Sequence, residues 1–308
     1  MPAVVLASRA PLLAPPPLAP GARVALVSPA GPLRGEEDVA RAVDNARSFG
    51  WEPAVSAHAL ARRGYLAGSD AERARDLNDA LLDPRVDAIW CLRGGYGAMR
   101  ILDALDYDAL RTRPRPLLGY SDITALHLAV AERCGLVSYH APTARAALTP
   151  FTRASLERAV VAGSDPCGGA PDARTLRPGR AEGVLVGGNL ALLAALAGTP
   201  YAPRFAGAVV VLEDIGEATY RVDRMLRQLL LAGLLDGCRA IVFGHCTNCP
   251  EESDDGARTL DEVVAEMADT LGVPCLAGVP VGHIDDQWTV PLGRLAEVDA
   301  DAKTMHVR

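Results

Sequence analysis

The sequence predicts an α/β protein with two domains, and three observations indicate this class. The chain has 308 residues, of which 49% are hydrophobic and 22% charged, so it can bury a substantial core. Short apolar runs rich in β-branched residues alternate with amphipathic stretches of helical period. Only 5% of residues are aromatic, whereas Gly (29) and Pro (23) are plentiful, which indicates an aliphatic core of short elements joined by tight turns.

The N-terminal part is expected to form a doubly wound, flavodoxin- or Rossmann-like domain around a parallel sheet. Apolar runs predict strands at residues 24–27, 53–56, 88–92, 116–119 and 136–139. The helical periods between them cover residues 36–49, 71–82, 98–105 and 123–134. Short continuous apolar strands between helices are typical of a parallel sheet that is covered on both faces. We therefore expect ligands beyond the carboxyl ends of these strands.

The C-terminal part is expected to form a mixed α/β domain with a β-rich tail. Strands are predicted at residues 183–186, 208–212 and 240–243, and helices at residues 190–196, 222–231 and 260–271. The last segments, at residues 275–281, 289–292, 295–298 and 305–307, read as short strands without helices between them. The predicted organisation is a disordered Pro-rich leader (1–20), an N-terminal domain (21–148), a linker with one short helix (149–182) and a C-terminal domain (183–308).

Charge and composition exclude several classes of function. The net charge of −7 and the absence of a basic stripe argue against a nucleic-acid partner. No apolar run is long enough for a membrane span, and the leader lacks the continuous apolar region of a signal peptide. The seven cysteines are odd in number and scattered, which argues against a disulfide framework and for a reducing cytoplasm. Cys246 and Cys249 beside His245 are too few for a zinc site, so no metal or other cofactor is expected.

The strongest local motif is Gly119-Tyr120-Ser121-Asp122, which ends a predicted strand and opens a helix. Such a turn is typical of a nucleophile elbow, in which the Ser121 hydroxyl projects above the sheet and the following amide, of Asp122, can hold an oxyanion. The usual second glycine is absent, because Ile123 stands there. The alternative is that Ser121 or Asp122 merely caps the helix.

A second glycine-rich loop, Arg93-Gly94-Gly95-Tyr96-Gly97, follows another predicted strand. Its glycines would let backbone amides approach a ligand closely and complete an oxyanion hole opposite Ser121. The spacing of a phosphate-binding loop is absent. The alternative is a tight turn without a binding role.

A nucleophilic serine needs a base and an acid that orients the base. Among the six histidines, His140, His245 and His283 follow predicted strands, and His283 lies in a turn where a side chain can be both exposed and rigidly held. Glu213 ends an apolar strand, and Glu217 lies close behind it. Either glutamate could orient the base or serve a helix terminus.

Taken together, these motifs resemble the LD-carboxypeptidase family, the muramoyltetrapeptide carboxypeptidases. The resemblance runs in order from about Gly21 to Asp299 and rests on the following motifs: Gly64-Tyr65-Leu66-Ala67-Gly68-Ser69-Asp70 with Arg73 and Leu77-Asn78, Arg93-Gly94-Gly95-Tyr96-Gly97, Gly119-Tyr120-Ser121-Asp122-Ile123-Thr124, Gly187-Gly188-Asn189-Leu190, Leu212-Glu213-Asp214-Ile215-Gly216-Glu217, Tyr220-Arg221-Val222-Asp223-Arg224, and Gly282-His283 followed by Pro291-Leu292-Gly293. It implies a cytoplasmic, metal-independent and homodimeric serine peptidase that removes the terminal D-Ala from murein tetrapeptide.

The resemblance also implies roles for single residues. Ser121 matches the nucleophile, His283 the general base and Glu213 the orienting acid, with Glu217 as the competing acid. The backbone amides of Asp122, Gly94 and Gly95 match the oxyanion hole. Substrate-binding side chains are expected at Arg93, Tyr96, Asn189, Glu217 and Arg221. Ile284 and Gln287 differ from the residues common in relatives at these positions. This difference affects the expected shape of the leaving-group pocket.

Two other functions fit the same features. Hydrolases that confer immunity to microcin C-like peptidyl nucleotides use the same triad, although the run from Gly216 to Arg224 is more similar to the murein enzymes. A two-domain binding protein without catalysis has a similar architecture. The presence of Ser121, Glu213 and His283 in matching contexts argues against a simple binder.

Overall fold

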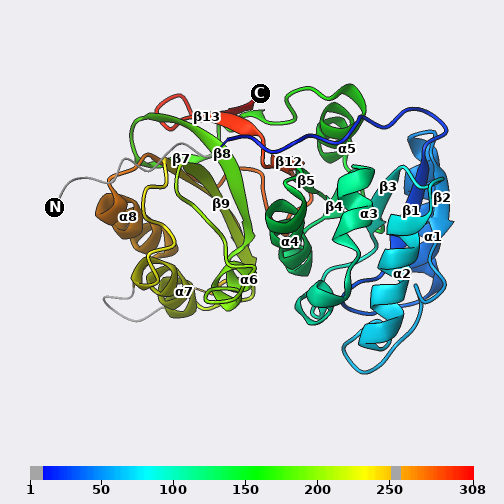
Figure 1. Ribbon diagram of the computed structural model, residues 1–308. Helices are drawn as coiled ribbons and strands as arrows, with labels where there is room; N and C mark the ends of the chain where they lie inside the picture. The colour runs from blue at the N-terminus through cyan, green and yellow to red at the C-terminus, as the bar shows by residue number, and fades with distance from the viewer. Residues whose placement is uncertain (1–9, 251–257) are drawn as a thin grey trace. The chain divides into compact units, whose positions relative to one another are not determined.

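The computed structural model describes residues 10–250 and 258–308 and divides the chain into two units. The N-terminal unit comprises residues 12–164 together with residues 285–291. The C-terminal unit comprises residues 165–284 and 292–308. Figure 1 labels many of the elements of both units.

The N-terminal unit contains a six-stranded sheet in the order β12-β5-β4-β3-β1-β2. Its strands are β1 (Arg23–Val27), β2 (Glu52–Val55), β3 (Ala88–Cys91), β4 (Leu117–Gly119), β5 (Ser138–His140) and β12 (Val290–Leu292). The pairs β2–β1, β1–β3, β3–β4 and β4–β5 are parallel. The order β2-β1-β3-β4-β5 is the flavodoxin-like one and confirms the predicted doubly wound fold.

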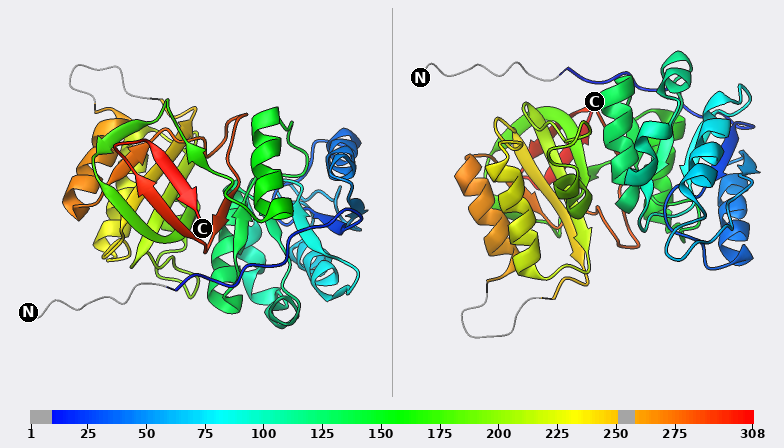
Figure 2. Two further views of the ribbon diagram at one scale, coloured as in Figure 1. Left: turned by 90° about the horizontal axis from the view of Figure 1, so that it is seen from above. Right: turned by 60° about the horizontal axis from the view of Figure 1, so that its bottom comes forward.

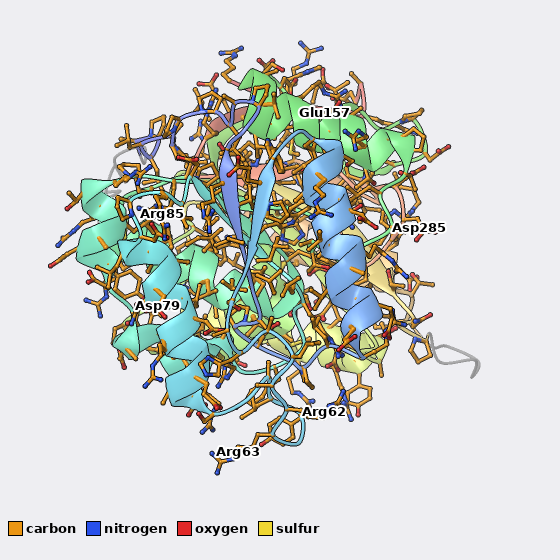
Figure 3. All side chains as sticks on the ribbon, turned by 90° about the vertical axis from the view of Figure 1, so that its right-hand side faces the viewer. Arg62, Arg63, Asp79, Arg85, Glu157 and Asp285 are labelled. Atoms are coloured by element: carbon orange, nitrogen blue, oxygen red, sulfur yellow. A yellow bond between two sulfur atoms is a disulfide. The ribbon has the colours of Figure 1, made fainter. Side chains whose placement is uncertain are left out.

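The helices of this unit cover both faces of its sheet. They are α1 (Glu36–Ser48), α2 (Asp70–Leu82), η1 (Ala98–Ala104), α3 (Tyr107–Thr112), η2 (Ser121–Ile123), α4 (Thr124–Cys134), α5 (Pro150–Glu157) and η3 (Arg158–Ala162). Figure 3 shows α1 and α2 on opposite sides of β1 and β2. The core is mostly aliphatic, and Trp90 of β3 packs edge-on against Phe49 and Trp51 at ring distances of 6.2 and 5.9 Å.

The C-terminal unit contains an eight-stranded mixed sheet in the order β6-β14-β13-β8-β9-β10-β11-β7. Its strands are β6 (Gly168–Gly169), β7 (Arg174–Arg177), β8 (Arg180–Asn189), β9 (Ala208–Ile215), β10 (Ala240–Thr247), β11 (Cys275–Ala277), β13 (Leu295–Asp299) and β14 (Thr304–Val307). The central strands β8, β9, β10 and β11 are parallel, and the outer pairs are antiparallel. Its helices are α6 (Leu190–Ala195), α7 (Thr219–Leu231) and α8 (Leu260–Leu271). Figure 2 shows α7 and α8 side by side on one face of this sheet.

The prediction of a disordered leader is wrong for the residues nearest to β1. Leu13 forms a parallel bridge with Leu136, and Leu18 is buried and donates its backbone N–H to Val160 at 2.7 Å. The prolines lack N–H groups, so this extended segment can pack on the unit and leave few backbone donors without partners. Residues 1–9 of the predicted leader lie outside the described residues.

The predicted linker and tail also differ from the structure. Residues 149–182 contain α5, β6, β7 and the start of β8, and the division between the units falls after Ser164. The tail strand near residue 290 joins the N-terminal sheet as β12, and not the C-terminal one. Helix α5 explains this placement, because Thr152 accepts the backbone N–H of Gln287 at 2.9 Å and Ser155 accepts that of Thr289 at 2.9 Å.

Although the sequence argues against a disulfide framework, one pair of cysteines is bonded. Cys246 and Cys249 are bonded to each other, and the remaining five cysteines are free. Asn248 between them has a φ of +54°, a left-handed turn that lets the chain fold back over so few residues. The bond is therefore local and links no distant parts of the chain.

Candidate active site

The turn after β4 has the geometry of a nucleophile elbow. Ser121 has a φ of +65°, a conformation that is rare outside glycine and that marks a sharp strand-to-helix turn. The N-termini of η2 and α4 have no side-chain cap, so neither Ser121 nor Asp122 serves as the helix cap that was the alternative. The strand, turn and helix thus follow one another as the motif predicts.

The glycine-rich loop after β3 lies directly against this turn. A Cβ atom at Gly94 would lie 2.9 Å from the Ser121 Cβ and 3.2 Å from its Oγ. Only glycine therefore lets the loop backbone approach the serine so closely. The Gly94 carbonyl accepts the N–H of Gly31 at 2.9 Å, which ties this loop to the one that follows β1.

The Asp122 side chain joins the two loops. It is 1% exposed, and its Oδ2 accepts the backbone N–H of Ala98 at 2.8 Å. Burial raises the pKa of Asp122 to about 6, although the hydrogen bonds from the loop and the positive charge of Arg73 act to lower it. The Asp122 carboxylate therefore positions the glycine-rich loop after β3. The backbone N–H of the same residue forms part of the turn at Ser121.

A histidine and a glutamate meet in the C-terminal unit. Glu213 on β9 is fully buried, and its Oε2 lies 2.8 Å from the Nδ1 atom of His283. The His283 carbonyl accepts the Thr247 hydroxyl at 3.0 Å, so both the ring and the backbone are held. With Nδ1 bound to the carboxylate, Nε2 is the ring nitrogen that can take a proton from a substrate or a nucleophile.

Gly282 explains how His283 reaches this position. Its φ is +126°, and a Cβ there would lie 3.1 Å from the His245 carbonyl oxygen and 3.2 Å from the Glu213 Cβ. The turn before His283 therefore requires glycine, as the Gly-His motif suggests.

The competing acid, Glu217, has a different environment. It forms an i,i+4 ion pair with Arg221 at 3.5 Å, and both side chains are partly exposed. Arg221 also donates its Nε to the Tyr220 hydroxyl at 3.2 Å. The structure thus brings His283 together with Glu213, and Glu217 together with Arg221.

Asn189 and Asp214 form a buried pair beside Glu213. The Asn189 Nδ2 donates to Asp214 at 3.0 Å, and its Oδ1 accepts the Leu192 N–H as the cap of α6. Burial raises the pKa of Asp214 to about 6. The predicted binding residue Asn189 therefore already supports the end of β8.

The remaining predicted binding residues lie on the glycine-rich loop. Tyr96 is half exposed and meets the exposed Tyr65 ring edge-on at 5.7 Å. Arg93 is partly buried, and its Nη1 donates to the Pro32 carbonyl. Three further arginines act on Arg93 through their charge: Arg34, Arg62 and Arg145. Each of them belongs to a different loop, so no motif in the sequence groups them.

Two other histidines also contact a carboxylate, His58 that of Asp76 at 2.7 Å and His306 that of Asp165 at 2.9 Å, but both lie outside the Gly-Tyr-Ser-Asp and Gly-His motifs. His127 is buried and contacts the Gly119 carbonyl at 2.8 Å and the Ser138 hydroxyl at 2.9 Å, and burial lowers its pKa to about 4. His140 is buried with its ring 5.8 Å from that of Tyr120. Among the described residues, no group of three or more His, Cys, Asp or Glu side chains could hold a metal ion.

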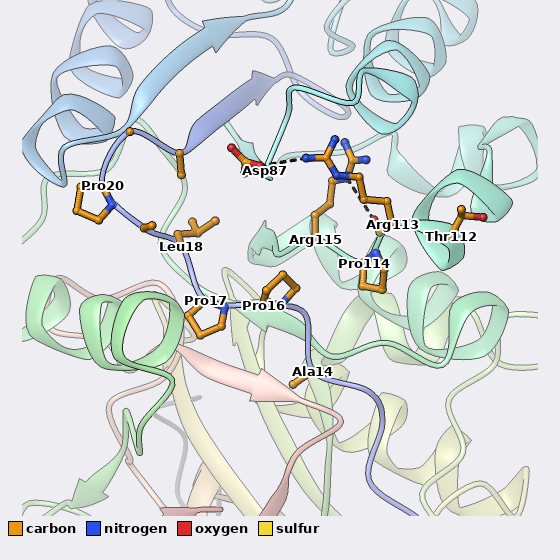
Figure 4. A pocket seen from close by; sticks show the side chains of 13 residues that line it. Ala14, Pro16, Pro17, Leu18, Pro20, Asp87, Thr112, Arg113, Pro114 and Arg115 are labelled. Carbon is orange, nitrogen blue, oxygen red and sulfur yellow. Dashed lines mark hydrogen bonds and ion pairs between the residues drawn. The ribbon is translucent and has the colours of Figure 1, made fainter.

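A cavity of about 600 Å³ lies at the opposite end of the N-terminal sheet, beside the start of β1 (Figure 4). Its charges are already partnered. Arg113 pairs with Asp87 at 3.2 Å, and the buried Arg115 donates to the Ala80 carbonyl at 2.7 Å. We therefore place the candidate site at the end of the sheet that bears Ser121.

Comparisons with known proteins show the family of this chain. The family model of the LD-carboxypeptidase N-terminal domain matches residues 24–141, and that of the C-terminal domain matches residues 182–298. A putative carboxypeptidase of Streptomyces coelicolor is 44% identical over 306 residues, which cover 96% of each chain. The murein tetrapeptide carboxypeptidase of Pseudomonas aeruginosa is 36% identical over 91% of this chain and 94% of its own.

One solved structure supports the same family, and a more distant relative carries the name of the alternative function. The muramoyltetrapeptide carboxypeptidase from Oxalobacter formigenes superposes with a TM-score of 0.82 at 30% identity, covering 92% of this chain and 97% of its own. The microcin C7 self-immunity protein of Escherichia coli is 26% identical over 79% of this chain and 80% of its own. Within the described residues, no helix is long and apolar enough to cross a membrane. With both family models matched in order and relatives aligned over nearly the whole length, the chain belongs to the LD-carboxypeptidase family.

Proposed function

We propose that this protein is a serine LD-carboxypeptidase that removes the terminal D-Ala from murein tetrapeptide. The observation that carries the proposal is the 2.8 Å contact between His283 Nδ1 and the buried Glu213 carboxylate. Such a pair is the base and orienting acid of a serine hydrolase, and Ser121 supplies a nucleophile on an elbow turn. The identity to named murein carboxypeptidases supports the substrate class.

In the proposed reaction, His283 Nε2 takes the Ser121 hydroxyl proton while Ser121 Oγ attacks the scissile carbonyl carbon. The carbonyl oxygen becomes an oxyanion, and the backbone N–H groups of Asp122 and the Gly94–Gly95 loop stabilise it. The C–N bond then breaks, and His283 returns the proton to the departing D-Ala amine. Water repeats the sequence on the ester and releases the tripeptide.

The charge of Glu213 has a defined role in these steps. It stabilises the imidazolium that forms at His283 and keeps the ring in the tautomer with the proton on Nδ1. The alternative acid, Glu217, is engaged by Arg221, which favours Glu213 for this role.

Cell location and assembly are part of the proposal. We propose a cytoplasmic homodimer that acts in cell-wall peptide recycling, on the strength of the family likeness. Size-exclusion chromatography with light scattering tests the dimer, and cell fractionation tests the location.

The test of the function uses two substrates, the parent protein and one variant. Purified protein should release D-Ala from murein tetrapeptide, whereas Ser121→Ala should bind the peptide and lose at least about three orders of magnitude in kcat. Faster hydrolysis of an aminoacyl sulfamoyl adenosine would favour the immunity hydrolase. Binding of the peptide without hydrolysis, and without labelling of Ser121 by a fluorophosphonate, would favour a binding protein.

A further inference from the structure

The N-terminal unit gathers four arginines at the end of the sheet that bears Ser121. They follow four different strands, and we call them the arginine cluster: Arg34 after β1, Arg62 after β2, Arg93 after β3 and Arg145 after β5. Ser121 follows β4, the remaining strand of the parallel set. Figure 3 shows Arg62 at the end of the unit where α2 begins, and Arg85 toward the other end of that helix.

The cluster lies at the topological switch point of the sheet. In the order β2-β1-β3-β4-β5, successive strands are added on one side of β1 and then on the other, so the strand order reverses between β1 and β3. Doubly wound proteins bind ligands beyond the carboxyl ends of such strands. The loops after β1 and β3 touch there, because Gly31 donates its N–H to the Gly94 carbonyl. The cluster thus lies where this fold binds ligands.

The cluster carries more positive charge than the nearby carboxylates neutralise. The buried Asp38 accepts Arg34 at 2.9 Å and Arg145 at 3.5 Å, and the charge of Glu37 also acts on Arg34. Among the described residues, Arg62 and Arg93 pair with no carboxylate. Arg62 donates to the Leu33 carbonyl at 2.8 Å, and Arg93 donates to that of Pro32.

The electrostatic environment of Arg93 reflects this imbalance. Burial lowers the pKa of Arg93 most, and the positive charges of Arg145, Arg34 and Arg62 lower it further. The negative charge of Asp38 acts in the opposite direction and raises it. The Nε atom of Arg145 is buried and has no hydrogen-bond partner in the described part of the chain. An anion would stabilise both groups.

The cluster is also close to the serine turn. A Cβ atom built at Gly31 or Gly95 would lie 3.6 or 3.9 Å from the Arg93 Nε, and one built at Gly94 would lie 3.2 Å from Ser121 Oγ. The Arg93 side chain and Ser121 thus both lie close to the short glycine-rich loop.

We propose that the arginine cluster binds the C-terminal carboxylate of the substrate peptide and so restricts cleavage to the last residue of a chain. This inference rests on the proposed function, because it assigns the anion to the leaving D-Ala. That carboxylate lies on the residue just after the scissile bond, which suits a cluster beside the serine turn. Guanidinium groups bind carboxylates through paired hydrogen bonds, and their anchoring to Asp38, Leu33 and Pro32 holds them in place before substrate arrives.

The test measures binding in the Ser121→Ala background, so that no turnover interferes. Titration calorimetry compares murein tetrapeptide with the same peptide carrying a C-terminal amide. Arg62→Gln, Arg93→Gln and Arg145→Gln should each weaken binding of the acid peptide about tenfold, the size expected for one hydrogen bond to a charged group. The amide peptide should bind weakly to the parent, and these substitutions should change its affinity less than about twofold.

Arg63→Gln is the matched control. Arg63 is the exposed neighbour of Arg62 and carries the same charge, but it lies outside the cluster. It should leave both affinities within about twofold of the parent. Equal losses for the acid and the amide peptide, or no losses, would overturn the inference.

The outcomes separate this inference from the proposed function. If the enzyme cleaves tetrapeptide but the cluster variants bind acid and amide peptides alike, the inference fails and the function stands. If the enzyme cleaves no peptide but the selective losses appear, the function fails while the cluster binds carboxylates. A third outcome is that the cluster variants lose more affinity for aminoacyl sulfamoyl adenosine than for the acid peptide. That result would assign the cluster to a nucleotide ligand and would also overturn the inference.

Discussion

The Glu213→Gln substitution tests the proposed charge pair most directly. Glutamine has the same shape as glutamate and can still accept the Nδ1 proton of His283, so the change removes charge with little loss of packing. At an effective dielectric constant of about 20, opposite unit charges at the observed separation of 2.8 Å attract each other by about 6 kcal/mol. Because each tenfold change in rate corresponds to about 1.4 kcal/mol, the full attraction is equivalent to about four orders of magnitude.

We therefore expect Glu213→Gln to lower kcat on murein tetrapeptide about 10³- to 10⁴-fold with little change in KM, because the imidazolium forms only along the reaction. Stopped assays of D-Ala release measure this. Chemical denaturation should show an equal or higher free energy of unfolding, since the substitution removes a fully buried charge. Glu217→Gln is the control, and the loss of its exposed pair with Arg221 should change kcat less than about fivefold. A large loss in Glu217→Gln with near-normal turnover in Glu213→Gln would refute the assignment.

Three further predictions concern other parts of the molecule. The folded pKa of Asp122, about 6, exceeds its ordinary value of 3.8, so the folded state binds more protons between these values. Its contribution to stability is therefore fully present below pH 3.8 and is lost as the pH rises through about 6. Urea unfolding should show Asp122→Asn gaining up to about 3 kcal/mol relative to the parent between pH 4 and 7, and a constant difference would contradict this. Gly94→Ala should lower kcat by about 100-fold or more, because its Cβ would lie 2.9 Å from the Ser121 Cβ, whereas Gly169→Ala, with no atom within 4 Å, should leave kcat unchanged. Thiol titration of denatured, unreduced protein should count five cysteines, and seven after reduction of the Cys246–Cys249 bond, and a count of seven without reductant would show that the bond is absent.

Local motifs made the serine turn and the parallel sheets predictable from sequence. An apolar strand, a glycine and an immediate helix are contiguous along the chain, so β4 and the Ser121 turn follow from the order of residues. The contact between His283 and Glu213 spans 70 positions, and spacing alone cannot predict it. It depends on the parallel alignment of β9 with β10 and on the turn at Gly282. Only the family resemblance supplied this pair.

The errors arose where tertiary contacts override local composition. The prolines of the leader suggest disorder, yet Leu13 and Leu18 provide contacts that hold the segment on the N-terminal unit. The residues near β12 read as part of the C-terminal tail, but the hydrogen bonds that Gln287 and Thr289 donate to Thr152 and Ser155 of α5 hold them in the other unit. Both outcomes depend on partners more than 100 positions away in the chain, which no local pattern records.

The arginine cluster also explains how an acidic chain can select an acidic substrate. The net charge of −7 disfavours the approach of an anionic peptide, but salt limits interactions between exposed charges to about 8 Å at physiological ionic strength. Within that distance, the cluster and its shared Asp38 determine the local field, and Arg62 and Arg93 keep donors that no carboxylate among the described residues occupies. Selection then depends on contact geometry at the sheet edge, and not on the overall charge. For this reason the composition could indicate neither the sign of the substrate nor the place where it binds.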